Sequence, residues 1–140
     1  MSTYERAVRT FTAAGTDEYV ELFGGAGCFE TELKGSAGSS FGQFDRIECR
    51  LQTTAATGSS PTLDLKIECT HNLDASLSEA VGTNWFTILT FTQATGVTQE
   101  NEQAVRTASV GLGVRVRAHF NYGGTSPAFT GVLYVLATGG

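Results

Sequence analysis

The side chains of this chain that can do acid–base or nucleophilic chemistry are few, and their spacing matches no catalytic pattern. The two histidines are His71, at the start of a predicted loop, and His119, on a predicted strand whose same face carries arginines. A serine hydrolase needs a histidine beside an activated serine, often on a Gly-x-Ser-x-Gly turn. Neither histidine has such a turn close to it in the sequence. We therefore predict no catalytic residue and no enzymatic activity.

The acidic residues and the glycine-rich runs also have simpler explanations than chemistry. Glu30 and Glu32, like Glu100 and Glu102, alternate along predicted strands, which suits a glycosidase only if an acid meets a base across a cleft. We interpret both pairs as surface acids. Glycine-rich runs between residues 24 and 38 lack the lysine and the strand-to-helix context of a phosphate-binding loop, so we interpret them as turns. No spacing suits calcium or zinc, and we expect no metal and no cofactor.

Arg115, Arg117 and His119 alternate along one predicted strand and form a cationic stripe on one of its faces. Such a stripe can receive a phosphate, a carboxylate of a partner, or acids within the fold. The chain has a net charge of −5, so we favour acids of its own. We also keep Arg115 and Arg117 as candidate interface residues, because arginine is enriched at protein interfaces. The only tryptophan, Trp85, can stack on a sugar, but its apolar neighbours favour burial in the core.

The N-terminal segment is the second candidate interface. Residues 1–11 are predicted as an edge strand or as an extended arm, because their alternation makes neither face cleanly apolar. Tyr4, Arg6 and Arg9 are of the types enriched at interface anchors. Chain ends usually stay disordered unless something holds them in place. We therefore expect these three residues to contact another subunit or a partner, with an ordinary edge strand as the alternative.

The composition fits one domain over residues 1–140 with a substantial core. Hydrophobic residues make up 41% of the chain and charged residues only 16%, and the 17 glycines favour many turns over long helices. The negative net charge does not suit a nucleic-acid-binding protein. The sequence shows no signal peptide and no stretch of transmembrane length, so we expect a soluble protein made in a cytoplasm, with no direct contact to nucleic acid or membrane. Three cysteines, an odd number, argue against a disulfide framework.

One strand–turn–strand unit occurs twice and determines the predicted fold class. The first copy joins residues 46–53 to 62–69 through Gly58-Ser-Ser-Pro, and the second joins 113–120 to 128–135 through Gly124-Thr-Ser-Pro. Alternating runs on both sides of such turns predict two long hairpins, each with its proline at the start of the returning strand. About eight short strands without βαβ alternation predict an all-β fold, an antiparallel two-sheet β-sandwich of jelly-roll-like type.

The phase of the alternation predicts which side chains face the core. The expected core residues are Ile47, Cys49, Leu51, Leu63, Leu65, Ile67, Val114, Val116, Phe129, Leu133 and Val135. Cys49 and Cys69 are expected as buried thiols rather than a disulfide. The residues that alternate with these in the first repeated unit are expected to lie on the solvated face of the sheet. They are Arg46, Glu48, Arg50, Asp64, Lys66 and Glu68.

The stretches outside the two repeated units are assigned from their own patterns. Residues 18–23, 28–33, 85–92 and 103–110 are predicted strands. Residues 34–42 and 95–103 are predicted loops, and residues 71–84 a short helix or a long loop. The last run, residues 132–136, has almost no polar phase, which predicts a strand covered on both faces by a second sheet or by a neighbouring subunit.

Three segments resemble a known class of protein. They are Ala56-Thr-Gly-Ser-Ser-Pro-Thr-Leu-Asp-Leu-Lys-Ile-Glu, Trp85-Phe-Thr-Ile-Leu-Thr-Phe-Thr-Gln-Ala-Thr-Gly, and Val114-Arg-Val-Arg-Ala followed by Gly124-Thr-Ser-Pro-Ala-Phe-Thr-Gly-Val-Leu. Their order resembles small virion structural proteins of tailed bacteriophages, some of which are capsid decoration (cement) proteins. The resemblance covers about Gly58 to Leu136, consists of turn-and-strand motifs, and does not extend to the part before Gly42.

The resemblance implies a phage virion structural protein. Its expected role is capsid decoration: it would bind the major capsid protein on the capsid surface, stabilise the head, and act as a homo-oligomer, a trimer or a dimer, after synthesis in the host cytoplasm. A neck, tail or head-fibre component is the alternative within the same class. A carbohydrate-binding β-sandwich module is the alternative from a different class.

Overall fold

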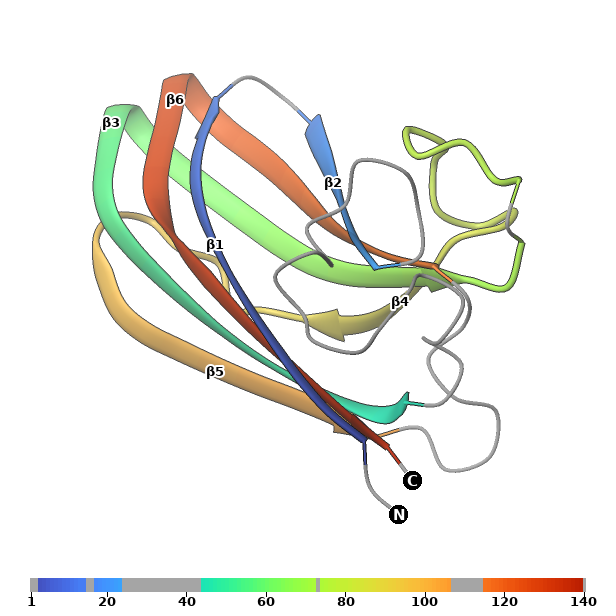
Figure 1. The fold of residues 1–140 in the computed structure, drawn as a ribbon. Coiled ribbons are helices and arrows are strands. Elements are labelled where there is room, and N and C mark those ends of the chain that lie inside the picture. Colours follow the sequence, from blue (N-terminus) through green and yellow to red (C-terminus); the bar gives the residue numbers. More distant parts are fainter. Residues whose placement is uncertain (1–2, 15–16, 24–43, 73, 107–114, 140) are drawn as a thin grey trace.

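The computed structural model describes residues 3–14, 17–23, 44–72, 74–106 and 115–139 (Figure 1). These residues form six strands: β1 (Thr3–Ala14), β2 (Asp17–Phe23), β3 (Phe44–Thr70), β4 (Phe86–Thr90), β5 (Thr98–Arg106) and β6 (Arg115–Gly139). None of them is helical, so the all-β prediction is confirmed for this part of the chain. The described part of the chain also contains no helix that is long and apolar enough to cross a membrane.

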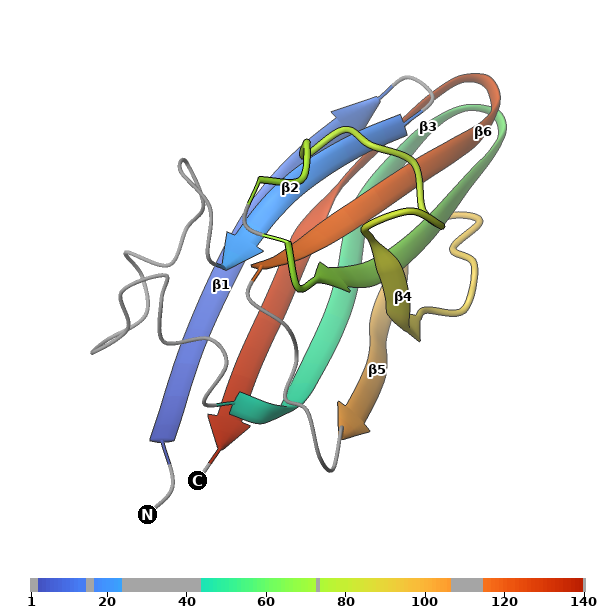
Figure 2. The same cartoon turned by 90° about the vertical axis from the view of Figure 1, so that its right-hand side faces the viewer.

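A pair of long strands organises the sheet. β3 and β6 run antiparallel along their whole length, from Phe44 opposite Gly139 to Thr70 opposite Arg115. β1 and β5 flank one half of this pair, and β2 and β4 flank the other half. Figure 1 shows that β3 and β6 bend side by side, and Figure 2 shows the same curled sheet after a turn of 90°. The described residues thus form one curled antiparallel sheet, with six strands instead of the eight strands in two sheets that we predicted.

The prediction of two hairpins was wrong. Residues 46–53 pair with β5 and β6, and not with residues 62–69 of the same unit. The two Gly-Ser/Thr-Ser-Pro motifs instead form the corner at which β3 and β6 bend side by side, with Ser59 opposite Thr125. A turn motif specifies a local change of chain direction, but it does not say whether the returning arm pairs with its own chain segment or with a neighbour. Pro61 and Pro127 lie inside the continuous strands β3 and β6, just after the corner, and not at the start of a separate returning strand as predicted.

The backbone at the corner explains the repeated motif. Ser60 and Ser126 both have φ 49°, and Gly58 and Gly124 have φ of 107° and 98°. A Cβ atom on Gly124 would lie 2.5 Å from the carbonyl oxygen of Ser60, and one on Gly58 would lie 2.6 Å from that of Ser126. Each motif therefore needs a glycine for its own conformation and for the close approach of the other motif.

The strand pairing has an approximate twofold symmetry centred on this corner. The symmetry exchanges β3 with β6, β1 with β4, and β2 with β5. For example, Glu21 lies opposite Arg117 in the β2–β6 pair, and Glu102 lies opposite Arg50 in the β5–β3 pair. The repeat in the sequence therefore marks equivalent positions of two related halves.

Of the other predicted segments, the strand at residues 18–23 corresponds to β2 and the strand at residues 85–92 contains β4. Residues 71–84 form a loop with turns and no helix among the residues described there. The loop predicted at residues 95–103 was partly wrong, because β5 begins at Thr98. Residues 98–103 are all polar, so their sequence lacks the apolar alternation that indicates a strand. The strand predicted at residues 28–33 and the loop at residues 34–42 lie outside the described residues.

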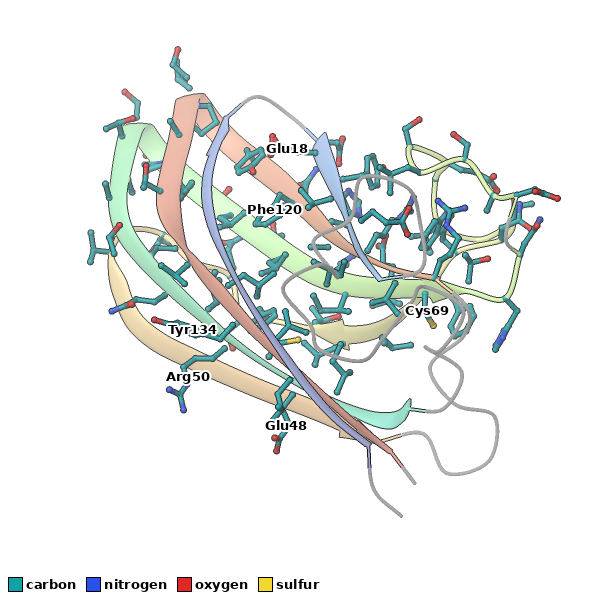
Figure 3. All side chains as sticks on the ribbon, viewed as in Figure 1. Glu18, Glu48, Arg50, Cys69, Phe120 and Tyr134 are labelled. Atoms are coloured by element: carbon teal, nitrogen blue, oxygen red, sulfur yellow. The ribbon has the colours of Figure 1, made fainter. Side chains whose placement is uncertain are left out.

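The core follows the predicted phase. All the predicted core residues are buried except Val114, which lies outside the described part of the chain. Leu65 and Ile67 have no exposed surface. Figure 3 shows that many side chains of the described residues lie inside the curled sheet. Cys49 and Cys69 are free, buried thiols. Burial raises the pKa of the Cys69 thiol to about 12 and raises that of Cys49 as well, so both stay protonated at neutral pH.

Candidate functional site

Among the residues that the structure describes, the main group of ionisable side chains lies on the face of β2, β3 and β6 that points away from the core. Residues 71–85 pass over this face, and Figure 3 shows side chains crowded between that segment, β2 and β6. We call this group the ion-pair cluster; it consists of Asp17, Glu21, Glu68, Arg115, Arg117 and His119. The prediction that the stripe on β6 meets acids of the same chain is confirmed for these residues.

Arg115 is the first residue of β6 and lies at one end of the cluster. Its Nη2 atom donates to the Glu21 carboxylate at 2.7 Å and its Nε atom donates to the same carboxylate at 3.3 Å. Its Nη1 atom donates to the backbone carbonyl of Ala75, and its guanidinium lies 5.1 Å from the Trp85 ring centre. Arg115 therefore ties β2 and the covering segment to β6.

Arg117 is fully buried at the centre of the cluster. Its Nε atom donates to the buried Glu68 at 2.8 Å, and its Nη1 atom donates to the Leu77 carbonyl. The guanidinium lies between two aromatic rings, 4.3 Å from the centre of Tyr19 and 4.2 Å from that of Trp85. Such stacking is attractive, by about 2 kcal/mol or more when the cation is desolvated. The Nη2 atom has no hydrogen-bond partner among the described residues.

His119 joins two carboxylates. Its Nδ1 atom lies 3.0 Å from Glu68 and its Nε2 atom lies 2.8 Å from Asp17. The Tyr19 ring stacks on the imidazole with 4.4 Å between ring centres. The hydrogen bond with Glu68 raises the pKa of His119, burial opposes this, and the hydrogen bond with Asp17 raises it further.

The two carboxyl groups bound to His119 respond in the opposite direction. Burial alone would raise the pKa of Glu68, but the hydrogen bonds from His119 and Arg117 lower it in the balance. Hydrogen bonds from His119 and Asn121 lower the pKa of Asp17. Both acids are therefore ionised at neutral pH and serve as acceptors for the cations around them.

The covering segment is held by its backbone and by one aromatic ring. Trp85 is 1% exposed, and its Nε1 atom donates to the Ser76 carbonyl at 2.9 Å. Asn84 donates to Glu79 at 2.9 Å and accepts from Asn72 at 3.2 Å, which closes the loop on itself. The burial of Trp85 that we predicted is confirmed, and its ring lies against the guanidinium groups of Arg115 and Arg117.

The arrangement of the cluster is suited to holding the fold together. Every ionised group in it has a partner of opposite charge, and a buried charge without one costs several kcal/mol. Among the described residues, no group of three or more His, Cys, Asp or Glu side chains is arranged to hold a metal ion.

The structure corrects the expectation for one acid and changes the interpretation of two arginines. We predicted Glu68 on a solvated surface, but it is fully buried because residues 71–85 cover that part of the sheet. Arg115 and Arg117, which we had kept as candidate interface residues, are 7% and 0% exposed. Both guanidinium groups serve internal contacts, so we do not propose that they touch a partner.

The other candidate residues lie elsewhere. Tyr4, Arg6 and Arg9 lie in β1, opposite Thr138, Leu136 and Leu133 of β6, so their backbone belongs to the sheet and is not a free arm. Glu100 and Glu102 lie in β5. Glu30 and Glu32 lie outside the described residues, as does Gly38-Ser-Ser-Phe-Gly, which matches the Gly-x-Ser-x-Gly spacing far from either histidine in the sequence.

Three large apolar side chains are exposed in the described part of the chain, which the sequence analysis did not identify. Val81 is 44%, Phe86 43% and Val97 67% exposed. The exposed His71 stacks on Phe86 with 5.7 Å between ring centres. Val81 forms an isolated β-bridge with Trp85, the residue before Phe86, so the backbone brings Val81 near Phe86. We call Val81, Phe86 and His71 the β4 patch.

Comparisons of the sequence with models of known protein families and with curated proteins gave no match.

Proposed function

We propose that the protein is a structural component of a tailed-phage virion, most specifically a capsid decoration protein. It binds the major capsid protein on the outer surface of the head, acts as a homo-oligomer, a trimer or a dimer, and stabilises the shell without chemistry. The single observation that carries this proposal is the resemblance of three segments to small virion structural proteins. It is made in the host cytoplasm, where reduced thiols such as Cys49 and Cys69 are normal.

The corner geometry supports the use of this resemblance. Two of the three segments contain the Gly-Ser/Thr-Ser-Pro motifs, whose glycines have positive φ and face each other's backbone. The fold requires glycines at these positions, so the presence of the same motifs in the virion proteins that the chain resembles favours a shared architecture. We also propose that the two halves of the curled sheet act as the two layers of a jelly-roll-like sandwich, since each half contains one arm of β3, one arm of β6 and two flanking strands.

The β4 patch is our candidate for the surface that binds the capsid protein. Aromatic residues are enriched at interfaces, and Phe86 is exposed at the start of β4. A stable interface buries roughly 800 Å² on each partner. Two or three side chains do not supply this area, so neighbouring surface must take part, and β1 with Tyr4, Arg6 and Arg9 remains a second candidate.

The proposal is tested with heads of the phage that encodes the chain, assembled without this protein. The purified protein is added, and its binding is measured by co-sedimentation and by electron microscopy of the heads. We expect binding at symmetry-related sites and heads that resist heating to a higher temperature. Phe86→Ser should weaken binding at least tenfold, whereas Val97→Ser, outside the β4 patch, is the matched control. Failure to associate with any part of the virion would refute the proposal.

β1 is tested by substitution instead of deletion. Removing residues 1–9 would also remove the pairing from Thr3 with Gly139 to Arg9 with Leu133, so the sheet itself would be damaged. The triple variant Tyr4→Ala, Arg6→Ala, Arg9→Ala leaves the backbone pairs in place. Weaker head binding by this variant would assign the interface to β1, and unchanged binding would exclude these side chains.

The alternatives predict different results. Association with necks, tails or fibres but not with heads would support another virion role. Specific binding to an immobilised glycan would support a carbohydrate-binding module. The burial of Trp85 removes the sole tryptophan as an exposed stacking platform, so this second alternative would have to use another aromatic residue.

A further inference from the structure

His119 is held in a geometry that only its protonated form satisfies. Each ring nitrogen lies within hydrogen-bond distance of a carboxylate oxygen, Nδ1 of Glu68 and Nε2 of Asp17. An ionised carboxylate only accepts hydrogen bonds, and a neutral imidazole has only one N–H group to donate. Both contacts therefore require an imidazolium ion.

The two carboxylates differ in how much they depend on His119. Glu68 is fully buried and also accepts a hydrogen bond from Arg117 at 2.8 Å. The side chain of Asp17 is 44% exposed, and besides His119 it accepts from Asn121 at 2.9 Å. A neutral His119 would keep its single N–H group on Glu68, because water can hydrate the exposed Asp17 but not the buried Glu68.

Asp17 is the first residue of β2, so its contact with His119 fastens one end of a strand. β2 pairs with β6, and its other contacts with the cluster are the Tyr19 ring, which lies against both His119 and Arg117, and Glu21, which binds Arg115. We propose that His119 is a proton-dependent clasp that fastens the start of β2 to β3 and β6, and that loss of its proton releases β2 locally while the Arg117–Glu68 pair stays in place.

The charged groups around His119 are consistent with this role. Glu68 and Lys66 face it from β3, Asp17, Tyr19 and Glu21 lie on β2, and Arg117 is its neighbour on the same face of β6. The acids outweigh the cations in direct contact, and the pKa of His119 is raised above its ordinary value of 6.5. The clasp is therefore fully closed below that ordinary value and opens as the pH rises through the raised pKa of the folded protein.

The test uses the intact chain and amide hydrogen exchange of β2 between about pH 5.5 and 9, corrected for the intrinsic pH dependence of exchange. We expect the protection factors of Tyr19, Val20 and Glu21 to fall about two- to fivefold as His119 loses its proton, the size expected of a partly exposed ion pair. Protection in the buried arm around Leu65 of β3 should stay constant. The titration of His119 is followed in parallel by nitrogen-15 shifts of its ring.

Two substitutions and one control make the test specific. His119→Gln cannot titrate and should abolish the pH dependence, and Asp17→Asn should reduce it and lower the pH at which His119 titrates. His71→Gln removes the other histidine, which is exposed against Phe86, and should change neither result. If His119→Gln does not fold, the wild-type ring shifts still decide, because a neutral His119 at pH 6 would overturn the proposal. Constant protection of β2 across the His119 titration would overturn it as well.

Discussion

Gly124 at the corner of the sheet allows the fold to be tested with one methyl group. In Gly124→Ala the new Cβ atom would meet the carbonyl oxygens of Ser60 and Ser59 at 2.5 and 2.8 Å, both of them backbone atoms that cannot move aside alone. The residue would also keep φ of 98°, a conformation that costs an alanine about 1–3 kcal/mol. Overpacking costs a further 1–3 kcal/mol or so. We expect a loss of about 2–6 kcal/mol, a large part of the usual 5–15 kcal/mol or so of a domain.

Three other glycines separate the two causes of this loss. Gly82 has φ of 121° with no atom within 4 Å of the place that an added methyl group would take, so Gly82→Ala should show the backbone strain alone, about 1–3 kcal/mol. Gly96 also has no atom within 4 Å of an added methyl group, but its φ is not in the positive range. Gly96→Ala should therefore be neutral or stabilise the protein by up to about 1 kcal/mol, because alanine lowers the conformational entropy of the unfolded chain. Gly58→Ala should resemble Gly124→Ala, because the approximate twofold symmetry makes the two sites equivalent.

The free energy of unfolding is measured by urea titration with the fluorescence of Trp85, which is the only tryptophan and is buried in the native state. All four variants share one assay and one reporter. A Gly124→Ala variant that loses no more stability than Gly82→Ala would refute the close approach of the two motifs at the corner. A large difference between Gly58→Ala and Gly124→Ala would refute their equivalence.

Three further predictions concern the core and the ion-pair cluster. Leu65→Ala should cost about 2–5 kcal/mol in the same assay, because the side chain is fully buried, and a loss below about half a kcal/mol would contradict the assigned strand phase. Glu68→Gln should cost about 3–5 kcal/mol of stability, because it leaves the buried Arg117 without its counter-charge. The control is Lys66→Gln, an exposed residue on the same strand, which should change stability by less than about 0.5 kcal/mol. Equal losses in the two variants would mean that the Arg117–Glu68 pair is not buried. The ionised forms of Asp17 and Glu68 stabilise the fold fully above their ordinary pKa values of 3.8 and 4.5, and this contribution should be lost as the pH falls through their lowered pKa values. The free energy of unfolding should therefore fall with pH when it is measured from pH 6 to 2. In Glu68→Gln the part of this pH dependence that is due to Glu68 should be absent.

The strand phase was predictable because it depends on local alternation. Residues 47, 49 and 51 and residues 63, 65 and 67 are apolar at every second position, and one face of each arm is buried. The strand partners were not predictable from the same pattern. The alternation around Gly58-Ser-Ser-Pro is the same whether the two arms pair with each other, as in a hairpin, or each pair with an arm of β6, as they do.

The ion-pair cluster was only half predictable for a related reason. Alternation placed Arg115, Arg117 and His119 on one face, and the net charge indicated acids of the chain as their partners. Whether that face is solvated or buried depends on where residues 71–85 pack, which is a tertiary property. Trp85 was a usable signal, since its apolar neighbours in the sequence favoured burial, but they did not indicate that the buried ring would lie against Arg117.

The length of the connection between β3 and β4 is best explained by this covering role. Cys69 and Phe86 are opposite each other in the β3–β4 pair, so a turn of about two to five residues would suffice to join the strands. The chain instead uses residues 70–85, and within them it places two carbonyl groups on arginines and an indole ring on Arg117. These contacts remove the guanidinium groups from water, which is tolerable only because Glu21 and Glu68 already neutralise them. The segment and the acids therefore depend on each other: without the acids the cover would bury uncompensated charge, and without the cover the acids and arginines would form surface ion pairs of little energetic value.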